Sequence, residues 1–200
     1  MRPGLQISGI TNLHDARYCA AVGITLLGFP MEGISAVTSE MISQIKPWLS
    51  GPEMVGEFEQ KEWQQIQAES ISGTIDRVSV PESLLFSDAE KTGLPLIIRF
   101  QKMPAEKFLR EIAQQLPGTL FEFPISGKNE IEWEEALSSS LISSFILDVI
   151  SPDPVWKILT KQGLHPHAFS LGNFVKTTQG DLDYDQCDAF IHQYQSLPVI

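Results

Sequence analysis

The start of the chain contains a strand–helix–strand pattern that strongly restricts the fold. Residues 5–11 form a short apolar run that ends in a turn, which predicts a strand. Asn12 is a typical N-cap residue and Asp15 favours a helix start, so a helix is expected to run from here until Gly23 ends it. Residues 24–29 form a second apolar run. Two strands joined by a crossover helix are parallel, so the pattern predicts a βαβ unit.

The same alternation continues to the end of the chain. Further strands are expected at residues 54–59, 75–80, 96–100, 119–123, 145–149 and 167–171. Helices are expected at residues 39–49, 61–69, 85–93, 105–115, 132–141, 154–162 and 184–195. An open doubly wound sheet rarely needs eight strand–helix units, whereas a closed barrel does. The sequence therefore predicts an α/β fold, a compact (βα)8 barrel in which residues 1–200 form one domain.

Charge and composition exclude several classes of protein. The net charge is −11 and the Lys and Arg residues occur singly, which argues against nucleic acid as a partner. No apolar run approaches the roughly 20 residues of a membrane span, and the N-terminus lacks a signal-peptide core. Cys19 and Cys187 do not make a disulfide framework. We expect a cytoplasmic protein without membrane association.

Charged residues interrupt the predicted strands near their ends. They are Glu57, Glu59, Arg77, Arg99, Glu122 and Asp148. Parallel barrel strands are covered on both faces and are normally apolar, because an isolated buried charge is unfavourable by several kcal/mol, on the order of the penalty for an unpaired ion. The chemistry of βα barrels occurs at the carboxyl ends of the strands. These residues therefore predict a charged network at the barrel mouth.

The alternation of sign along the chain suggests how the charges are paired. Barrel layers take side chains from alternate strands, so Glu57 and Arg99 are expected in one layer, and Arg77 and Glu122 in the next. The alternative for any one residue is that it points outward at a strand end into solvent. We expect at least three of Glu57, Arg77, Arg99, Glu122 and Asp148 to line the mouth.

Three segments resemble one enzyme family. They are residues 6–11 with Asp15, Ala16, Gly23 and residues 27–29; residues 55–59; and residues 180–191. The first resembles the start of phosphoribosylanthranilate isomerase, a compact βα barrel of tryptophan biosynthesis, and the others resemble its third strand and its last loop and helix. That family opens a phosphorylated ribosylamine ring and moves a proton, which requires a general acid and a general base.

The resemblance implies catalytic roles at two positions. Ser8 stands where the family has the cysteine that acts as base, and a serine hydroxyl without an adjacent base is a far poorer proton acceptor. Loss of a positioned base lowers a rate by typically about 10² to 10⁴. Glu122 is the nearest match to the family's aspartate acid, and Asp148 on the next strand is the alternative.

The resemblance also implies where a phosphate would bind. Ser170 and Gly172 retain part of the family's phosphate turn after the last strand, but residues 148–152 contain no glycine for the other turn. The family's carboxylate-binding arginine is replaced near Ser35, and its histidine on the fourth strand by Ser79 or a neighbour. Arg77 and Arg99 are then the candidate anion holders, since arginine binds phosphate or carboxylate through paired donors.

Other chemistry-bearing residues have simpler explanations. His165 and His167 precede the last strand, on the face of a barrel that serves stability, and lack further ligands. The acidic residues at 181–188 fit a helix entry better than a calcium loop. We expect no metal and no cofactor.

These residues lead to one functional prediction with two alternatives. The prediction is a protein similar to phosphoribosylanthranilate isomerase, with weak or no activity on the usual substrate. One alternative is an enzyme acting on another small anion, with Glu122 and Asp148 as acid and base and Arg77 or Arg99 holding the substrate. The other is a non-catalytic barrel that binds a metabolite or a partner. The expected ligand is a small anionic or phosphorylated metabolite, and the expected state is a monomer or homodimer.

Overall fold

The computed structural model describes residues 2–70, 72–85, 93–125, 140–160, 165–172 and 174–197, and its eight strands form a closed parallel barrel. Each strand pairs with the next one along the chain, and the last returns to pair with the first. The strands are β1 (Gly4–Ile7), β2 (Leu26–Pro30), β3 (Glu53–Glu57), β4 (Arg77–Pro81), β5 (Leu96–Arg99), β6 (Leu120–Ile125), β7 (Phe145–Val149) and β8 (Ala168–Ser170). The predicted (βα)8 barrel is confirmed.

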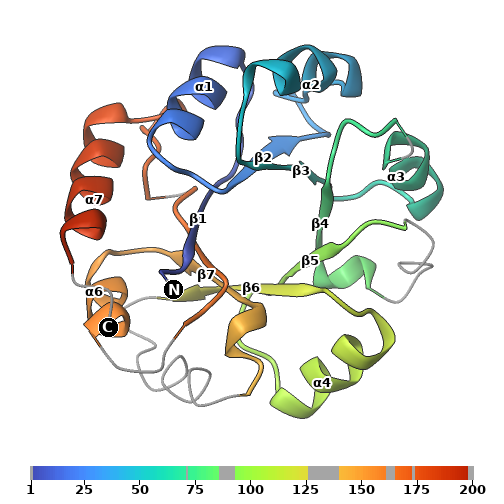
Figure 1. Ribbon diagram of the computed structural model, residues 1–200. Helices are drawn as coiled ribbons and strands as arrows, with labels where there is room; N and C mark the ends of the chain where they lie inside the picture. The colour runs from blue at the N-terminus through green and yellow to red at the C-terminus, as the bar shows by residue number, and fades with distance from the viewer. Residues whose placement is uncertain are drawn as a thin grey trace.

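Helices surround the ring of strands (Figure 1). The α-helices within the described residues are α1 (Leu13–Ala21), α2 (Ser39–Ile45), α3 (Trp63–Ser70), α4 (Glu106–Gln115), α6 (Asp153–Thr160) and α7 (Tyr184–Ser196). Short 3-10 helices occur at η1 (Lys46–Trp48), η2 (Glu82–Leu84) and η4 (Ile142–Ser144). Most of the helix expected at 85–93 and nearly all of that at 132–141 lie outside the described residues. None of the described helices has the length and apolar character of a membrane span.

The first βαβ unit forms as predicted, except that its first strand is shorter. The side chain of Asn12 caps α1 by accepting the backbone N–H of Asp15 at 2.9 Å. Gly23 follows the helix with a φ of +91°, in the left-handed region that favours glycine. β1 ends at Ile7 rather than four residues later. Ser8 therefore lies just beyond the strand, at the carboxyl end of the barrel.

The barrel interior contains one apolar layer. Its members are Leu26, Val55, Ile97, Leu120, Ile146 and Ala168. A larger apolar cluster, which includes Phe121 and Phe145, fills the space between strands and helices. Successive residues of a strand point to opposite faces, so Leu120 and Glu122 both point toward the barrel axis. Polar residues that lie two positions beyond the apolar layer thus face the axis near the mouth.

One helix ends earlier than its sequence pattern predicts. The helix expected at 39–49 divides into α2 and the 3-10 helix η1, which contains Pro47. Proline has no backbone N–H and clashes with the preceding turn, which explains the change. Trp48 in η1 is exposed, whereas Trp63 at the start of α3 is buried against the barrel.

The last helix covers the seam where β8 meets β1. The hydroxyl of Tyr194 in α7 donates to the carbonyl of Pro3, and Arg2 donates to the carbonyl of Leu197 at 2.6 Å. The Arg2 guanidinium also lies over the Tyr194 ring, 5.1 Å from its centroid. These contacts attach α7 to the residues before β1, and the Tyr194 ring also packs edge-on against Phe169 of β8, so α7 supports both strands.

Candidate functional site

The carboxyl ends of the strands surround a cavity of about 250 Å³. It is lined by Ser8, Glu57, Arg99, Phe100, Glu122, Phe123, Pro124, Asp148, Ser170 and Gly172. Four of the five strand-end charges considered in the sequence analysis are in this group. The prediction that at least three of them line the mouth is therefore confirmed.

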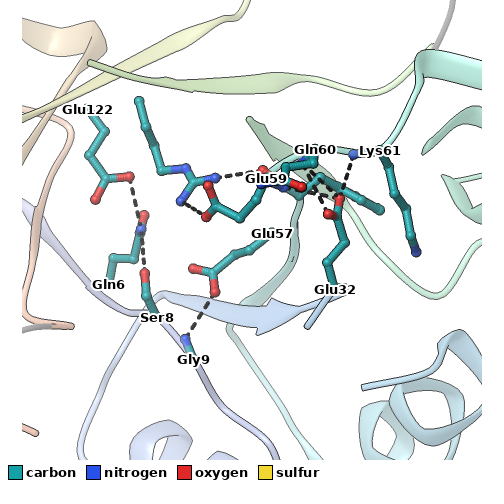
Figure 2. A network of polar contacts seen from close by, with 11 residues as sticks. Gln6, Ser8, Gly9, Glu32, Glu57, Glu59, Gln60, Lys61 and Glu122 are labelled. Atoms are coloured by element: carbon teal, nitrogen blue, oxygen red, sulfur yellow. Dashed lines mark hydrogen bonds and ion pairs between the residues drawn. The ribbon is translucent and has the colours of Figure 1, made fainter. Parts of the chain in front are cut away.

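Glu122 is a buried carboxyl group in the wall of this cavity. Burial and the neighbouring charge of Asp148 raise its pKa to about 7, although a hydrogen bond from Ser170 and the charge of Arg99 act in the opposite direction. The side-chain amide of Gln6 donates to Glu122 Oε2 at 3.4 Å (Figure 2). A carboxyl group with this pKa exchanges its proton near neutral pH, as a general acid or base requires.

Glu57 is a second buried carboxylate, and the backbone of neighbouring strands shapes its position. The backbone N–H of Gly9 donates to Glu57 Oε2 at 3.0 Å (Figure 2). A Cβ atom at Gly28 would lie 2.0 Å from Glu57 Oε1, so the carboxylate occupies space that only glycine leaves open. Burial raises the pKa of Glu57, while the Ser8 hydroxyl and the charge of Arg99 lower it.

Ser8 is linked to both buried carboxyl groups, to Glu57 directly and to Glu122 through the side chain of Gln6. Its hydroxyl donates to Glu57 and accepts from the Gln6 amide, whose nitrogen is 3.3 Å from Ser8 Oγ. A Cβ atom at Gly172 would lie 3.0 Å from Ser8 Cβ, so β1 and the turn after β8 approach closely here. The Ser8 hydroxyl is therefore the donor and the Glu57 carboxylate the acceptor of this hydrogen bond.

Arg99 lies in the mouth as predicted, but much of its hydrogen-bonding capacity is already used. Its guanidinium donates to Glu59 Oε1 at 2.6 Å and to the carbonyl of Phe58 at 2.7 Å. Among the described residues the predicted Glu57–Arg99 ion pair is not formed: Arg99 pairs with Glu59 at 2.6 Å, and its charge lowers the pKa of Glu57 without direct contact. The Arg99 Nε is buried and has no hydrogen-bond partner among the described residues.

Arg77 is not in the mouth, so the predicted Arg77–Glu122 pair and the anion-holding role of Arg77 are wrong. Arg77 is the first residue of β4 and lies at the amino-terminal end of the barrel. Its Nε donates to Glu53 Oε2 at 3.0 Å and one terminal nitrogen to the carbonyl of Gly118 at 3.4 Å. The position of a residue along its strand sets its height along the barrel axis. Arg77 begins its strand, whereas Glu122 lies at the cavity formed by the carboxyl ends, so the two cannot pair.

Ser170 and Gly172 are both at the cavity, but Ser170 already has a carboxylate partner. Ser170 is buried and hydrogen-bonds to Glu122. A phosphate in this position would lie beside Asp148, which pairs in register with Ser170 and lines the same cavity. The two residues that match part of the family's phosphate turn therefore contribute to a wall rich in carboxyl groups.

Three further residues support the site and were not singled out from the sequence. Gln6 is a fully buried polar residue within an otherwise apolar strand, which is a usable sequence signal. Lys176 donates to the carbonyl of Gly9 at 2.8 Å, beside Glu57. This last contact is not visible from sequence spacing, because Lys176 and Gly9 are 167 positions apart.

Glu32, the third of these residues, fixes the loop after β3. Its carboxylate accepts the backbone N–H groups of Glu59, Gln60 and Lys61, at 2.9 to 3.1 Å for the shortest contact to each (Figure 2). The Lys61 ammonium returns to the carbonyl of Met31 at 2.9 Å. The loop that presents Glu59 to Arg99 is thus held by a carboxylate of the preceding loop.

Neither His165 nor His167 contributes to the cavity; both are exposed and precede β8. Across the part of the chain that the structure describes, no group of three or more His, Cys, Asp or Glu residues is arranged to hold a metal ion.

Comparison with known proteins identifies the fold. No family model matches the chain, and no curated protein matches it in sequence. Among solved structures, phosphoribosyl anthranilate isomerase from Thermus thermophilus is 21% identical with a TM-score of 0.73, over 99% of this chain and 100% of that one.

Two further structures carry phosphorylated ligands. One is phosphoribosyl anthranilate isomerase in complex with reduced 1-(o-carboxyphenylamino)-1-deoxyribulose 5-phosphate, 19% identical with a TM-score of 0.72, over 98% of this chain and 100% of that one. The other is KGPDC from Streptococcus mutans in complex with a phosphorylated ligand, 14% identical with a TM-score of 0.62, over 96% of this chain and 97% of that one. At these identities the likeness shows a shared barrel fold.

Proposed function

We propose that the barrel mouth is an acid–base site that moves a proton on a small polar metabolite, with Glu122 and Asp148 as its acid and base. The observation that carries the proposal is the buried Glu122 carboxyl group, whose pKa is raised to about 7 in the wall of an open cavity. A catalytic acid or base is most effective when its pKa lies near the working pH. Asp148 contributes to that raised pKa and lines the same cavity.

The same proposal includes weak or absent isomerisation of phosphoribosylanthranilate. By the sequence resemblance, Ser8 corresponds to the cysteine of phosphoribosylanthranilate isomerase, and its hydroxyl is hydrogen-bonded to Glu57 and Gln6. The turn after β7 has no glycine that would bring backbone N–H groups close to a phosphate. A phosphorylated ligand, as in the two complexes described above, therefore has less support here than a small polar ligand without phosphate.

A non-catalytic barrel is the second candidate, and one observation favours it. Arg99 is bonded to Glu59 and Phe58, and Ser170 to Glu122, so several mouth groups already bind one another. The cavity of about 250 Å³ nevertheless leaves room for a small ligand. Acid–base chemistry is preferred because Glu122 and Asp148 both lie in the wall of this cavity, where a bound ligand would contact them.

Exchange of solvent deuterium tests the catalytic proposal directly. The protein is incubated in D2O with D-ribose, D-ribulose or D-ribulose 5-phosphate, and deuterium next to the carbonyl group is followed by proton NMR. Wild type is expected to incorporate deuterium into at least one of them, and Glu122→Gln to do so about 10² to 10⁴ times more slowly. Equal rates for the two proteins, or no incorporation by wild type, would refute the acid–base proposal.

A genetic test addresses the isomerase activity separately. The chain is expressed in a tryptophan auxotroph that lacks phosphoribosylanthranilate isomerase, beside a genuine isomerase as positive control. Little or no growth without tryptophan is expected. Growth at the rate of the positive control would overturn the claim of lost activity.

A further inference from the structure

The charge at the mouth is strongly unbalanced toward carboxyl groups. Among the described residues, Glu57, Glu122 and Asp148 line the cavity together with one cationic side chain, Arg99, and the Lys176 ammonium group lies beside Glu57. The Arg99 guanidinium is itself bonded to a fourth acid, Glu59, outside the cavity wall. An anion entering this space meets three carboxyl groups, whereas a cation or a hydrogen-bond donor meets matching partners.

Two buried polar groups next to the cavity wall have no hydrogen-bond partner among the described residues. Gln6 is fully buried, and its amide lies between two cavity-lining side chains, Ser8 and Glu122. The Ser8 hydroxyl donates its hydrogen bond to Glu57, so it accepts one from the Gln6 NH2 group. The carbonyl oxygen of Gln6 has no hydrogen-bond partner among the described residues. The buried hydroxyl of Ser79, opposite Glu57 in the β3–β4 pairing, also has none. A buried acceptor without a partner is unfavourable by roughly 1–3 kcal/mol.

We propose that the mouth takes a small ligand that carries a protonated amine and several hydroxyl groups but no phosphate, such as an amino polyol, with the amine among Glu57, Glu122 and Asp148. The inference rests on the proposed function in that it names the ligand class of the same cavity. The three carboxyl groups in the cavity wall supply the counter-charge. The cavity of about 250 Å³ is smaller than the roughly 300–1,000 Å³ of drug-sized sites, which limits the ligand to a few carbon atoms.

Proton linkage distinguishes an amine from a phosphate. The charged groups that act on Glu122 are Asp148 from β7, Glu57 from β3 and Arg99 from β5, with Ser170 of β8 as a hydrogen-bond donor. A bound ammonium group favours ionised Glu122, so binding releases protons near neutral pH. A bound phosphate favours the protonated form, so binding takes up protons.

Three ligands with the same carbon chain provide the test: 1-amino-1-deoxy-D-ribitol, ribitol and D-ribitol 5-phosphate. Affinity is measured by calorimetry, and proton exchange with a pH indicator in weakly buffered solution. The amine is expected to bind best, to release protons, and to bind about tenfold more tightly at about pH 8 than at about pH 6, given a Glu122 pKa of about 7. Ribitol is expected to bind at least about tenfold more weakly than the amine, by loss of one charge-assisted contact.

Two substitutions on one strand provide matched variants. Glu57→Gln removes a mouth carboxylate and is expected to weaken amine binding about tenfold or more. Glu53→Gln makes the same change at the other end of β3, where Glu53 pairs with Arg77, and is expected to leave amine binding unchanged. Circular dichroism of both variants checks that the barrel is retained. Equal loss of binding in the two variants would count against a site at the mouth.

Three results would overturn the inference. They are tighter binding of ribitol 5-phosphate with proton uptake, equal binding of amine and ribitol, and absence of binding by all three at millimolar concentration. None of these results depends on turnover, so the acid–base proposal stands or falls separately, on the deuterium exchange of wild type and Glu122→Gln. A phosphate-binding mouth that exchanges deuterium would refute the ligand class alone.

Discussion

The two ends of this barrel differ in how their charged residues are balanced. At the amino-terminal end, Arg77 is the first residue of β4, pairs in register with Val55, and is neutralised by Glu53 and the carbonyl of Gly118. At the carboxyl-terminal end, three carboxyl groups line one cavity with Arg99, which is itself paired to Glu59. Both ends carry charged residues at strand ends, so strand-end charge by itself does not mark a site. The imbalance of charge distinguishes the mouth.

The largest expected effect is a change of the unfolding free energy with pH that is caused by Glu122 in the mouth. The pKa of Glu122 is about 7 in the folded chain and 4.5 is its ordinary value, so the folded state holds a proton that the unfolded state has lost. Stability therefore falls as pH rises from about 4.5 to 7 and then levels off, by up to about 3 kcal/mol. Glu122→Gln is expected to remove this fall, and to be more stable than wild type at about pH 9 by a similar amount.

Urea unfolding of both proteins between about pH 5 and pH 9 measures this effect. The control is Glu53→Gln at the paired end, whose pH dependence is expected to follow that of wild type. Parallel stability curves for wild type and Glu122→Gln would mean that Glu122 is not perturbed in the folded protein.

A smaller effect is expected at the paired end. Arg77→Met removes the ion pair to Glu53 and the hydrogen bond to Gly118 while keeping much of the side-chain volume. The expected loss is about 1–2 kcal/mol of unfolding free energy, because Glu53 stays nearly half exposed and water solvates the charge that is left. Amine binding at the mouth is expected to stay unchanged. Altered binding in a folded Arg77→Met protein would show that the two ends are coupled.

The smallest effect on stability is expected for Glu59→Gln, a substitution next to the mouth. Glu59 is more than half exposed, so its pair with Arg99 stabilises the fold by only about 0.5 kcal/mol. Its removal frees part of the Arg99 guanidinium and makes the mouth less negative. Binding of inorganic phosphate, followed by phosphorus NMR, is expected to improve about twofold to threefold at low salt. Weaker phosphate binding would contradict the electrostatic reasoning.

Much of the fold is predictable because it depends on local patterns. The capped helix after β1 and the alternation of apolar runs identify a closed barrel, and the predicted strand at 145–149 has the bounds of β7. Strand ends are less predictable. The predicted strand at 75–80 had Arg77 in its third position, whereas β4 begins at Arg77. Arg77 therefore lies at the amino-terminal end of the barrel and not at the mouth, where it was predicted.

The site was only partly predictable, because its contacts join distant residues. Strand-end charge correctly selected Glu57, Arg99, Glu122 and Asp148 as mouth residues. The contact of Gln6 with Glu122 spans 116 positions, and a single sequence gives no sign of it. The pairing of Arg99 with Glu59 could not be predicted from the sequence either, because it depends on the loop that Glu32 holds in place.

The close approach of Gly28 to the Glu57 carboxylate has a consequence for recognising related chains. Glu57 can keep its present side-chain conformation only where position 28 carries no side chain, because a Cβ atom there would lie 2.0 Å from its oxygen. The two positions should therefore change together among homologues: glycine with glutamate, or a larger residue with a shorter or apolar one. That joint signature, on neighbouring strands, would separate barrels with this mouth from those that share only its architecture.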